Sequence, residues 1–291
     1  MKLRFTKMHG CGNDYVYVNC MEKMLPNPGK ISEYVSPRHL SVGSDGLICI
    51  CPSKVADFRM RMFNADASEG KMCGNGTRCI AKYVYDKGLT DKTEITLETL
   101  SGIKTIRMKV VDGKVREATV DMGEPIADTK RIPMDWPGAE CRNEEIEVLF
   151  QGKKVKVRGT AVSMGNPHFV TLVPDVETAP VEALGRVIEH SPLFPEQVNV
   201  EFVQIVDRDH VKFRVWERGS GETYACGTGA CAVAYTMVTQ GLAGRRDSFL
   251  KVQALGGMLE LNYGSDGHMM LRGPAETVYE GEMEIPDELL R

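Results

Sequence analysis

The sequence predicts an α+β protein of two pseudosymmetric domains, because one plan of strand, loop and helix occurs twice along its 291 residues. In each copy a cysteine precedes a Gly-x-Gly segment, in Met72-Cys73-Gly74-Asn75-Gly76-Thr77-Arg78 and in Ala225-Cys226-Gly227-Thr228-Gly229-Ala230. The same offset of 153 residues pairs Asn13 with Asn166, Asn64 with Glu217, Glu69 with Glu222 and Gly88 with Gly241. Duplication of one unit explains these matches, and two similar halves that face each other would bring the two cysteines together.

The strands and helices around each cysteine follow from the spacing of apolar residues. Residues 58–63 and 210–215 alternate apolar and polar side chains, which predicts a half-buried strand before each cysteine. A helix is expected after each cysteine, because its apolar positions lie on one helical face and match between the copies. These positions are Ile80, Ala81 and Val84 in the first copy, and Val233, Ala234 and Met237 in the second. Both helices are expected to end at glycine, Gly88 and Gly241, which accepts the left-handed conformation of a helix C-terminus.

Strands are expected to resume after each helix, at residues 94–99 and 249–254. Glycine turns then introduce further strands in both copies. Each half is therefore predicted to be a strand-rich sheet or barrel wrapped around one principal helix, with the active site in the cleft between the halves. The tail is expected to return to the first half, so the N-terminal domain comprises residues 1–122 plus 272–291 and the C-terminal domain residues 123–271.

Composition and charge exclude several classes of protein. A hydrophobic content of 42% suffices for two cores, and a net charge of −4 without a long basic run disfavours a nucleic-acid partner. No apolar run approaches the roughly 20 residues of a membrane span, and the first residues lack a signal-peptide core, so we expect no membrane partner and a cytoplasmic location. Nine cysteines in such a chain are expected to be reduced, and their spacing around Cys73 and Cys226 does not predict a metal site.

The two cysteine motifs predict a specific chemistry. A thiol at the first turn of a helix lies near unpaired backbone N–H groups and the positive end of the helix dipole, which favours its anion. The same N–H groups can hold a carboxylate. Two thiols on opposite faces of one carbon can remove a proton from one face and return a proton to the other. Cys73 and Cys226 are therefore candidate catalytic residues of a racemase or epimerase that needs no pyridoxal phosphate or other cofactor.

Several motifs resemble those of the diaminopimelate epimerase family, from residue 3 to about residue 281. They are residues 8–15 (MHGCGNDY), 63–70 (FNADASEG), 72–76 (MCGNG), 165–168 (GNPH), 198–199 (VN), 216–219 (WERG) and 225–229 (ACGTG). The resemblance implies cofactor-independent interconversion of LL- and meso-diaminopimelate, in the synthesis of lysine and of peptidoglycan precursors. It also implies two pseudosymmetric α/β domains with the site in their cleft, commonly in a homodimer.

The resemblance assigns roles to individual residues. Cys73 and Cys226 would be the acid/base pair, and four backbone N–H groups would hold the reacting carboxylate: those of Gly74, Asn75, Gly227 and Thr228. The substrate pocket would be lined by Asn13, Asn64, Asn166, Asn199, Glu217 and Arg218. The planar guanidinium of Arg218 suits a bidentate contact with the distal carboxylate of the substrate.

The duplication is broken at two positions that carry ionisable groups. His168 occupies the place of Tyr15, and Glu217 occupies the place of Asn64, under the offset of 153 residues. Two identical thiols in identical surroundings would not reliably differ in protonation. We therefore expect His168 and Glu217 to tune the pKa of the thiols, so that one is deprotonated while the other keeps its proton.

Other functions remain open from the sequence. Gly46 stands where many family members carry glutamine, and Ala67 where glycine is usual, which affects the assignment of the substrate. A related histidine or proline racemase would use the same two-cysteine scheme, although proline racemases tend to have histidine at the position of Asn75. A protein of a different class, which binds an amino acid and senses redox state through a Cys73–Cys226 disulfide, would need the same facing thiols.

Overall fold

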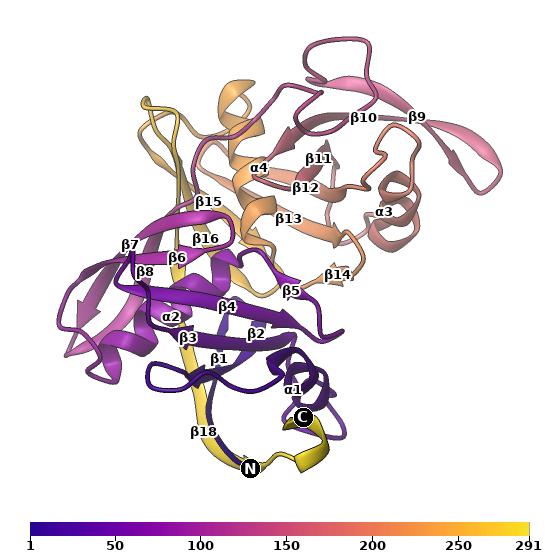
Figure 1. Cartoon of the computed structure of the whole chain (residues 1–291). Coiled ribbons are helices and arrows are strands. Elements are labelled where there is room, and N and C mark those ends of the chain that lie inside the picture. The colour runs from indigo at the N-terminus through magenta and orange to yellow at the C-terminus, as the bar shows by residue number, and fades with distance from the viewer. Residues whose placement is uncertain (291) are drawn as a thin grey trace. The chain divides into compact units, whose positions relative to one another are not determined.

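The computed structural model describes residues 1–290, which fall into two compact units. The first unit comprises Met1–Val120 together with the residues from Arg272 onward, and the second comprises Asp121–Leu271. Each unit combines a mixed sheet with one long and one short helix (Figure 1). Among the described residues, no helix has the length and apolar character needed to cross a membrane.

The first unit is built on a mixed sheet in the order β18-β1-β2-β3-β4-β6-β7-β8. The pairs β2–β3 and β4–β6 are parallel, and the other neighbours are antiparallel. The C-terminal strand β18 therefore lies beside the N-terminal strand β1 (Figure 1). The elements are β1 (Lys2–Gly10), β2 (Asn13–Asn19), α1 (Pro28–Val35), β3 (Gly46–Cys51), β4 (Phe58–Asn64), β5 (Glu69–Gly70), α2 (Gly74–Asp86), β6 (Glu94–Thr99), β7 (Gly102–Val111), β8 (Lys114–Asp121), β18 (Glu276–Glu284) and the 3₁₀ helix η1 (Asp287–Leu290).

The second unit repeats this arrangement in the order β9-β10-β11-β12-β13-β15-β16. The pairs β11–β12 and β13–β15 are parallel, and the remaining neighbours are antiparallel. The elements are β9 (Glu144–Phe150), β10 (Lys153–Ser163), β11 (Pro167–Leu172), α3 (Val181–Glu189), β12 (Asn199–Asp207), β13 (His210–Glu217), β14 (Gly221–Thr223), α4 (Gly227–Thr239), β15 (Phe249–Ala254), β16 (Gly257–Tyr263) and β17 (Met269–Pro274).

The predicted fold class, two pseudosymmetric and strand-rich α+β halves, is confirmed by this repetition. The long helices α2 and α4 have the same length and are offset by 153 residues at both ends. The prediction named one principal helix per half, and the structure adds the short helices α1 and α3, which also correspond under the offset. Neither short helix has a side-chain cap hydrogen bond, although Asn27 and Pro28 at the start of α1 are residues typical of a helix start.

The core of the first unit explains how its long helix is placed. All six residues of β3 are buried, because α1 and α2 both pack against this sheet. Leu47, Cys49 and Cys51 join a cluster that includes Ile31 of α1. The intervening residues of a strand point to the opposite face, where Ile48 meets the first turn of α2. The central strand β3 is therefore apolar throughout, whereas β4, the strand predicted before Cys73, alternates buried and half-buried residues over Phe58–Met62.

Both long helices end in the predicted glycine caps. Gly88 and Gly241 have φ of 71° and 66°, in the left-handed region. The backbone N–H of the next residue, Leu89 or Leu242, donates to the carbonyl oxygen five residues earlier, at 2.8 and 2.9 Å. These bonds satisfy carbonyl groups that the end of a helix would otherwise leave unpaired.

We expect Gly88→Ala and Gly241→Ala each to destabilise the protein by about 1–2 kcal/mol, the cost of placing an ordinary residue in the left-handed region. A Cβ at either position would have no atom within 4 Å, so the loss would report backbone strain and not a clash. Denaturant unfolding measures the change. Asparagine, which tolerates this conformation, should cost less at both positions, and equal stability of the alanine and glycine forms would contradict this account.

Candidate active site

The two cysteines singled out in the sequence are the N-cap residues of the two long helices. Cys73 precedes α2 with φ −130° and ψ 117°, and Cys226 precedes α4 with φ −114° and ψ 115°. In each case the sulfur accepts a hydrogen bond from the backbone N–H three residues later, of Gly76 or Gly229, at 3.3 Å. Each sulfur therefore lies at the positive end of a helix dipole, where negative charge is stabilised.

The glycines that cap these thiols allow the helices to approach the sheet closely. A Cβ built on Gly76 would lie 2.8 Å from Cδ1 of Ile48, and a Cβ built on Gly229 would lie 2.7 Å from Oε1 of Glu201. These distances are shorter than normal contacts, so the second glycine of each motif is required by packing. The close approach fixes the position of the first helical turn, and with it the position of the thiol.

Asn13 is oriented toward Cys73 by a carboxylate. Its Nδ2 donates to Oδ2 of Asp45 at 2.8 Å, which leaves its Oδ1 to accept from Sγ of Cys73 at 3.1 Å and from Nδ2 of Asn75 at 3.3 Å. A carboxylate oxygen only accepts, so Asp45 determines which end of the Asn13 amide faces the thiol. Asp45 is itself held by Nη2 of Arg38 at 2.7 Å. The first unit thus brings three predicted residues together: Asn13, Cys73 and Asn75.

A fully buried arginine lies beneath the start of α2. Arg78 donates through Nη1 to the carbonyl oxygen of Gly74 at 3.2 Å, through Nη2 to Oδ1 of Asn75 at 2.9 Å, and through Nε to the carbonyl oxygen of Pro274 at 3.2 Å. No carboxylate within residues 1–290 forms an ion pair with it. Arg78 therefore orients the backbone and the side chain of the first turn without its charge being neutralised locally.

Glu217 lies close to Cys226 in the second unit. Burial raises the pKa of Glu217, and its Oε1 accepts a hydrogen bond from Oγ1 of Thr223. Burial also raises the pKa of the Cys226 thiol well above its usual range, and the charges of Glu217 and Glu201 raise it further. Oγ1 of Thr228 lies 3.4 Å from the sulfur. These surroundings favour the protonated form of Cys226.

His168 of β11 and Asn166, which immediately precedes that strand, form a connected group in the second unit. The Nε2 atom of His168 lies 3.0 Å from Oδ1 of Asn166, and its Nδ1 atom lies 2.6 Å from Oε1 of Glu201. The imidazole is completely buried. In the first unit the corresponding residue, Tyr15, is also buried, and burial raises its pKa well above the usual range, so it stays neutral at physiological pH.

Asn199 and Arg218 are linked to each other through the backbone. The Asn199 side chain donates to the carbonyl oxygen of Pro167 at 2.8 Å and accepts from the backbone N–H of Arg218 at 3.0 Å. Its amide therefore supports the turn that carries Arg218. The Arg218 side chain is exposed and donates to the carbonyl oxygen of Glu196 at 2.8 Å.

Asn64 is the one predicted pocket residue that lies apart from these groups. It is the last residue of β4, and its Nδ2 donates to Oγ of Ser68 at 2.9 Å. The predicted residues therefore gather around the two helix starts, one set in each unit, with Asn64 and Arg218 at the ends of the equivalent strands β4 and β13.

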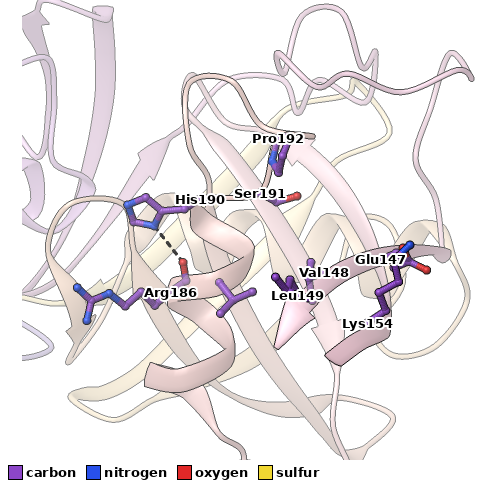
Figure 2. Close-up of a pocket in the computed structure, with 9 residues that line it drawn as sticks. Glu147, Val148, Leu149, Lys154, Arg186, His190, Ser191 and Pro192 are labelled. Carbon is purple, nitrogen blue, oxygen red and sulfur yellow. Dashed lines mark hydrogen bonds and ion pairs between the residues drawn. The ribbon is translucent and has the colours of Figure 1, made fainter. Parts of the chain in front are cut away.

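A pocket of about 800 Å³ in the second unit contains none of these residues. Figure 2 shows His190 and Arg186 of α3 on one side of it and Leu149 and Lys154 of the β9–β10 hairpin on the other. Nδ1 of His190 bonds the carbonyl oxygen of Arg186 at 3.0 Å, which completes the end of α3. Across residues 1–290, no three His, Cys, Asp or Glu side chains are grouped so as to hold a metal ion.

The arrangement of paired cysteine caps matches one known family. The family model described as diaminopimelate epimerase matches residues 5–127 and 160–278 of this chain. The chain belongs to the diaminopimelate epimerase family.

Relatives from this family are similar over nearly the whole chain. Diaminopimelate epimerases from Acetivibrio thermocellus and from Methanococcus maripaludis strain S2 are each 50% identical over 284 residues, which cover 97% of this chain and 99% and 100% of the relatives. The diaminopimelate epimerase of Bacillus subtilis is 50% identical over 281 residues, covering 96% of this chain and 97% of that protein.

Solved structures with the same fold are far more distant in sequence. A phenazine biosynthesis protein of the PhzF family from Bacillus anthracis superposes with a TM-score of 0.70 at 19% identity, covering 98% of this chain and 100% of that chain. A probable proline racemase from Agrobacterium radiobacter superposes with a TM-score of 0.72 at 14% identity, covering 98% and 93%. At these identities the similarity establishes the shared fold alone.

The structure describes the backbone at two positions that the sequence singled out, Gly46 and Ala67. A Cβ built on Gly46 would lie 2.2 Å from the carbonyl oxygen of Phe63, so the backbone here leaves no room for a side chain. Ala67 has a φ of 70°, in the left-handed region that favours glycine. Neither residue contacts the two cysteine caps in the hydrogen bonds described above.

Three residues of these sites escaped prediction from the sequence. Asp45, Arg78 and Glu201 hold Asn13, Asn75 and His168. Comparison of the two copies contains a usable signal, because Arg78 corresponds to Cys231 and Glu201 to Ile48 under the offset of 153 residues. A charged residue that replaces an apolar one in a buried element calls for a partner or a function.

We expect Glu217→Gln to lower the pKa of Cys226, because the substitution removes a nearby negative charge while keeping the shape of the side chain. The onset of Cys226 alkylation by iodoacetamide, followed by mass spectrometry as a function of pH, should move down by about one unit or more. Glu222→Gln is the matched control, since Glu222 pairs with Arg214 and should leave the alkylation profile unchanged. An unchanged profile in Glu217→Gln would mean that burial alone sets the pKa of this thiol.

Proposed function

We propose that this chain interconverts LL- and meso-diaminopimelate by a two-base mechanism that uses Cys73 and Cys226 and no cofactor. The observation that carries the proposal is that both cysteines are N-caps of equivalent helices, with a glycine-rich first turn beside each sulfur. Relatives that are 50% identical over almost the whole chain bear the name diaminopimelate epimerase, which supports the choice of substrate.

The reacting carboxylate of the substrate is held at the two helix starts. The backbone N–H groups of Gly74 and Asn75 begin α2, and those of Gly227 and Thr228 begin α4. The first N–H groups of a helix have no carbonyl partner within the helix, so they are available to an anion. Removal of the α-proton places additional negative charge on this carboxylate, and the same hydrogen bonds stabilise the transition state.

The proton transfer is balanced between two sulfurs. A thiolate takes the α-proton and becomes a thiol, while the electron pair of the C–H bond remains on the carbon and its carboxylate. The opposite thiol then gives its proton to the other face of that carbon and becomes a thiolate. The enzyme ends with its protonation exchanged, so solvent must restore the starting state before the next turnover in the same direction.

The electrostatics of the second unit favour Cys226 as the proton donor. Burial and the nearby carboxylates raise the pKa of this thiol. The equivalent positions of the first unit carry no ionisable side chain, with Ile48 in place of Glu201 and Asn64 in place of Glu217. We therefore assign the base to Cys73 when the α-proton faces that residue. Glu217 and the His168 group are the elements that distinguish the two thiols.

Arg218 supplies recognition of the distal carboxylate. Its side chain is exposed and donates a hydrogen bond to the carbonyl oxygen of Glu196. Within residues 1–290 it forms no ion pair with a carboxylate. A guanidinium can bind a carboxylate bidentately, which an ammonium group cannot copy. Asn199 holds the backbone of this residue, and Asn13, Asn64 and Asn166 supply further polar contacts to the substrate.

Three finer points accompany the proposal. The domains correspond to residues 1–122 plus 272–291 and residues 123–271, and each contributes one of the two thiols. The protein acts as a homodimer in the cytoplasm, as the family resemblance implies. The alternatives, a proline or histidine racemase and a redox-sensing binding protein, are separated from this function by substrate tests and by α-proton exchange.

Cys73→Ala and Cys226→Ala should each abolish epimerisation, because each face of the α-carbon needs its own proton carrier. Serine should be nearly as inactive, since a hydroxyl group is far too weak an acid to supply the base. Epimerisation of LL-diaminopimelate and incorporation of deuterium at the α-carbon in deuterated water measure the effect under reducing conditions. Circular dichroism should show an intact fold, and full activity of either alanine variant would exclude the two-base mechanism.

Arg218→Lys should raise the KM for diaminopimelate by about 10-fold to 150-fold, equivalent to the roughly 1.5–3 kcal/mol of a charge-assisted hydrogen bond. The kcat should change little, because the distal carboxylate is remote from the reacting carbon. Arg214→Lys serves as the control, since Arg214 is paired with Glu222.

The substrate assignment has its own test, independent of any variant. The wild-type protein is incubated in deuterated water with diaminopimelate, proline and histidine, and deuterium incorporation is compared. Rapid exchange with proline or histidine but not with diaminopimelate would make the substrate assignment wrong and leave the two-thiol chemistry in place. No exchange with any amino acid would favour the redox-sensing alternative.

A further inference from the structure

Glu201 is a buried carboxyl group that has no place in the reaction described above. It lies in the middle of β12 between apolar residues, and its side chain is completely buried. Its Oε1 lies 2.6 Å from Nδ1 of His168, whereas its Oε2 is buried and has no hydrogen-bond partner. Burial of a carboxyl group with one oxygen unsatisfied costs free energy, so its presence needs a reason.

The hydrogen bonds of His168 determine where protons lie. The carbonyl oxygen of the Asn166 side chain accepts, so the Nε2 atom that faces it at 3.0 Å carries a hydrogen. The short contact between Nδ1 and Oε1 then needs a second proton, because two acceptors do not approach to 2.6 Å. The pair is either imidazolium with carboxylate or imidazole with carboxylic acid. In both forms it has no net charge and shares one proton.

The His168–Glu201 pair packs against the start of α4, where Cys226 lies. A Cβ built on Gly229 would lie 2.7 Å from Oε1 of Glu201 and 3.4 Å from Sγ of Cys226. The carboxyl group and the sulfur therefore both lie close to the same glycine. A movement of the Glu201 side chain would therefore displace the first turn of α4.

The first unit shows that the fold does not need a carboxyl group here. Ile48 occupies the equivalent position in β3 and packs against Gly76, the counterpart of Gly229, at 2.8 Å from a built Cβ. The same packing problem is thus solved once by an apolar side chain and once by a carboxyl group. Replacement of a buried ionisable pair by apolar residues is often neutral or stabilising, so stability does not explain Glu201.

We propose that Glu201 is a positioning residue for the epimerisation, which shares a proton with Nδ1 of His168 so that Nε2–H is directed at Asn166 and the Asn166 amide is fixed with its N–H group toward the substrate. This inference rests on the proposed function. Without the carboxyl group the ring could take the other tautomer, the hydrogen bond to Oδ1 of Asn166 would be lost, and the amide could turn. Glu201 thereby acts on the substrate through two other side chains.

The ionisable groups that face Glu201 come from each element that packs on it. They are His168 on β11, Glu217 at the end of β13 and Cys226 at the start of α4. A change at Glu201 should therefore alter the pH dependence of kcat and not only its size, because the protonation states of these groups are coupled.

The principal test is Glu201→Gln, which keeps the shape of the side chain but supplies an amide in place of the shared proton. We expect kcat for diaminopimelate to fall by about 10-fold to 100-fold, at the lower end of general acid–base effects, with a displaced pH profile and a KM within about twofold. In proton NMR the wild-type protein should show a strongly deshielded exchangeable proton from the Nδ1–Oε1 bond. The variant should lack this resonance.

A second variant, Glu201→Ile, copies the residue found in the first unit. It should unfold at the same temperature as the wild type or at a higher one, and its kcat should fall at least as far. The proposal would be overturned if Glu201→Gln kept the wild-type kcat and pH profile, or if the substitution changed only KM. It would also be overturned if the wild-type protein lacked the deshielded proton. If the wild-type protein fails to epimerise diaminopimelate, the proposed function fails instead, and the proton resonance still tests the His168–Glu201 pair.

Discussion

The close approach of each long helix to the middle of its sheet is the constraint on which the sites depend. Gly76 and Gly229 allow a contact that a Cβ would forbid, and this contact sets the first turn of α2 and α4. The cysteine three residues earlier then takes an extended backbone conformation and accepts a hydrogen bond from the same glycine. The position of the thiol at each helix cap is thus a consequence of tight packing between a helix and a strand.

The duplicated scaffold creates a chemical problem that the side chains behind the thiols address. Identical halves would give identical thiols, whereas a two-base reaction needs one to donate while the other accepts. The two units differ where the helix meets the sheet: Arg78 lies beneath the start of α2, and Glu201 beneath the start of α4. Arg78 is a cation, whereas Glu201 shares a proton with His168, and both side chains are fully buried, where screening by solvent is weak. This difference between the two units therefore lies in side chains that support the helix starts, behind the residues that would touch the substrate.

Most of the architecture could be predicted from the sequence, because the duplication supplied two independent copies of each pattern. Strand periodicity, the matching apolar faces after Cys73 and Cys226, and the glycines at 88 and 241 located the long helices and the strands before them. The short helices α1 and α3 were not predicted, although Asn27 and Pro28 at the start of α1 are typical of a helix start. The roles of Asn199 and Arg218 were only partly anticipated, since the direction in which an amide or a guanidinium points depends on neighbours brought close by folding, here Pro167 and Glu196.

Glu201 and Arg78 show why the supporting residues were harder to predict than the cysteines. A cysteine before Gly-x-Gly indicates a candidate site from the local sequence alone, since the cap, the turn and the helix are all within a few residues. The role of a buried charged residue depends on its partners on other strands, which are far away in sequence. Glu201 and His168, for example, are separated by 33 residues. In a duplicated chain the second copy supplies the missing reference, because Ile48 and Cys231 show what the fold alone requires at those two positions. Comparison of the two halves, position by position, therefore separates the residues that build the scaffold from those that distinguish its two thiols.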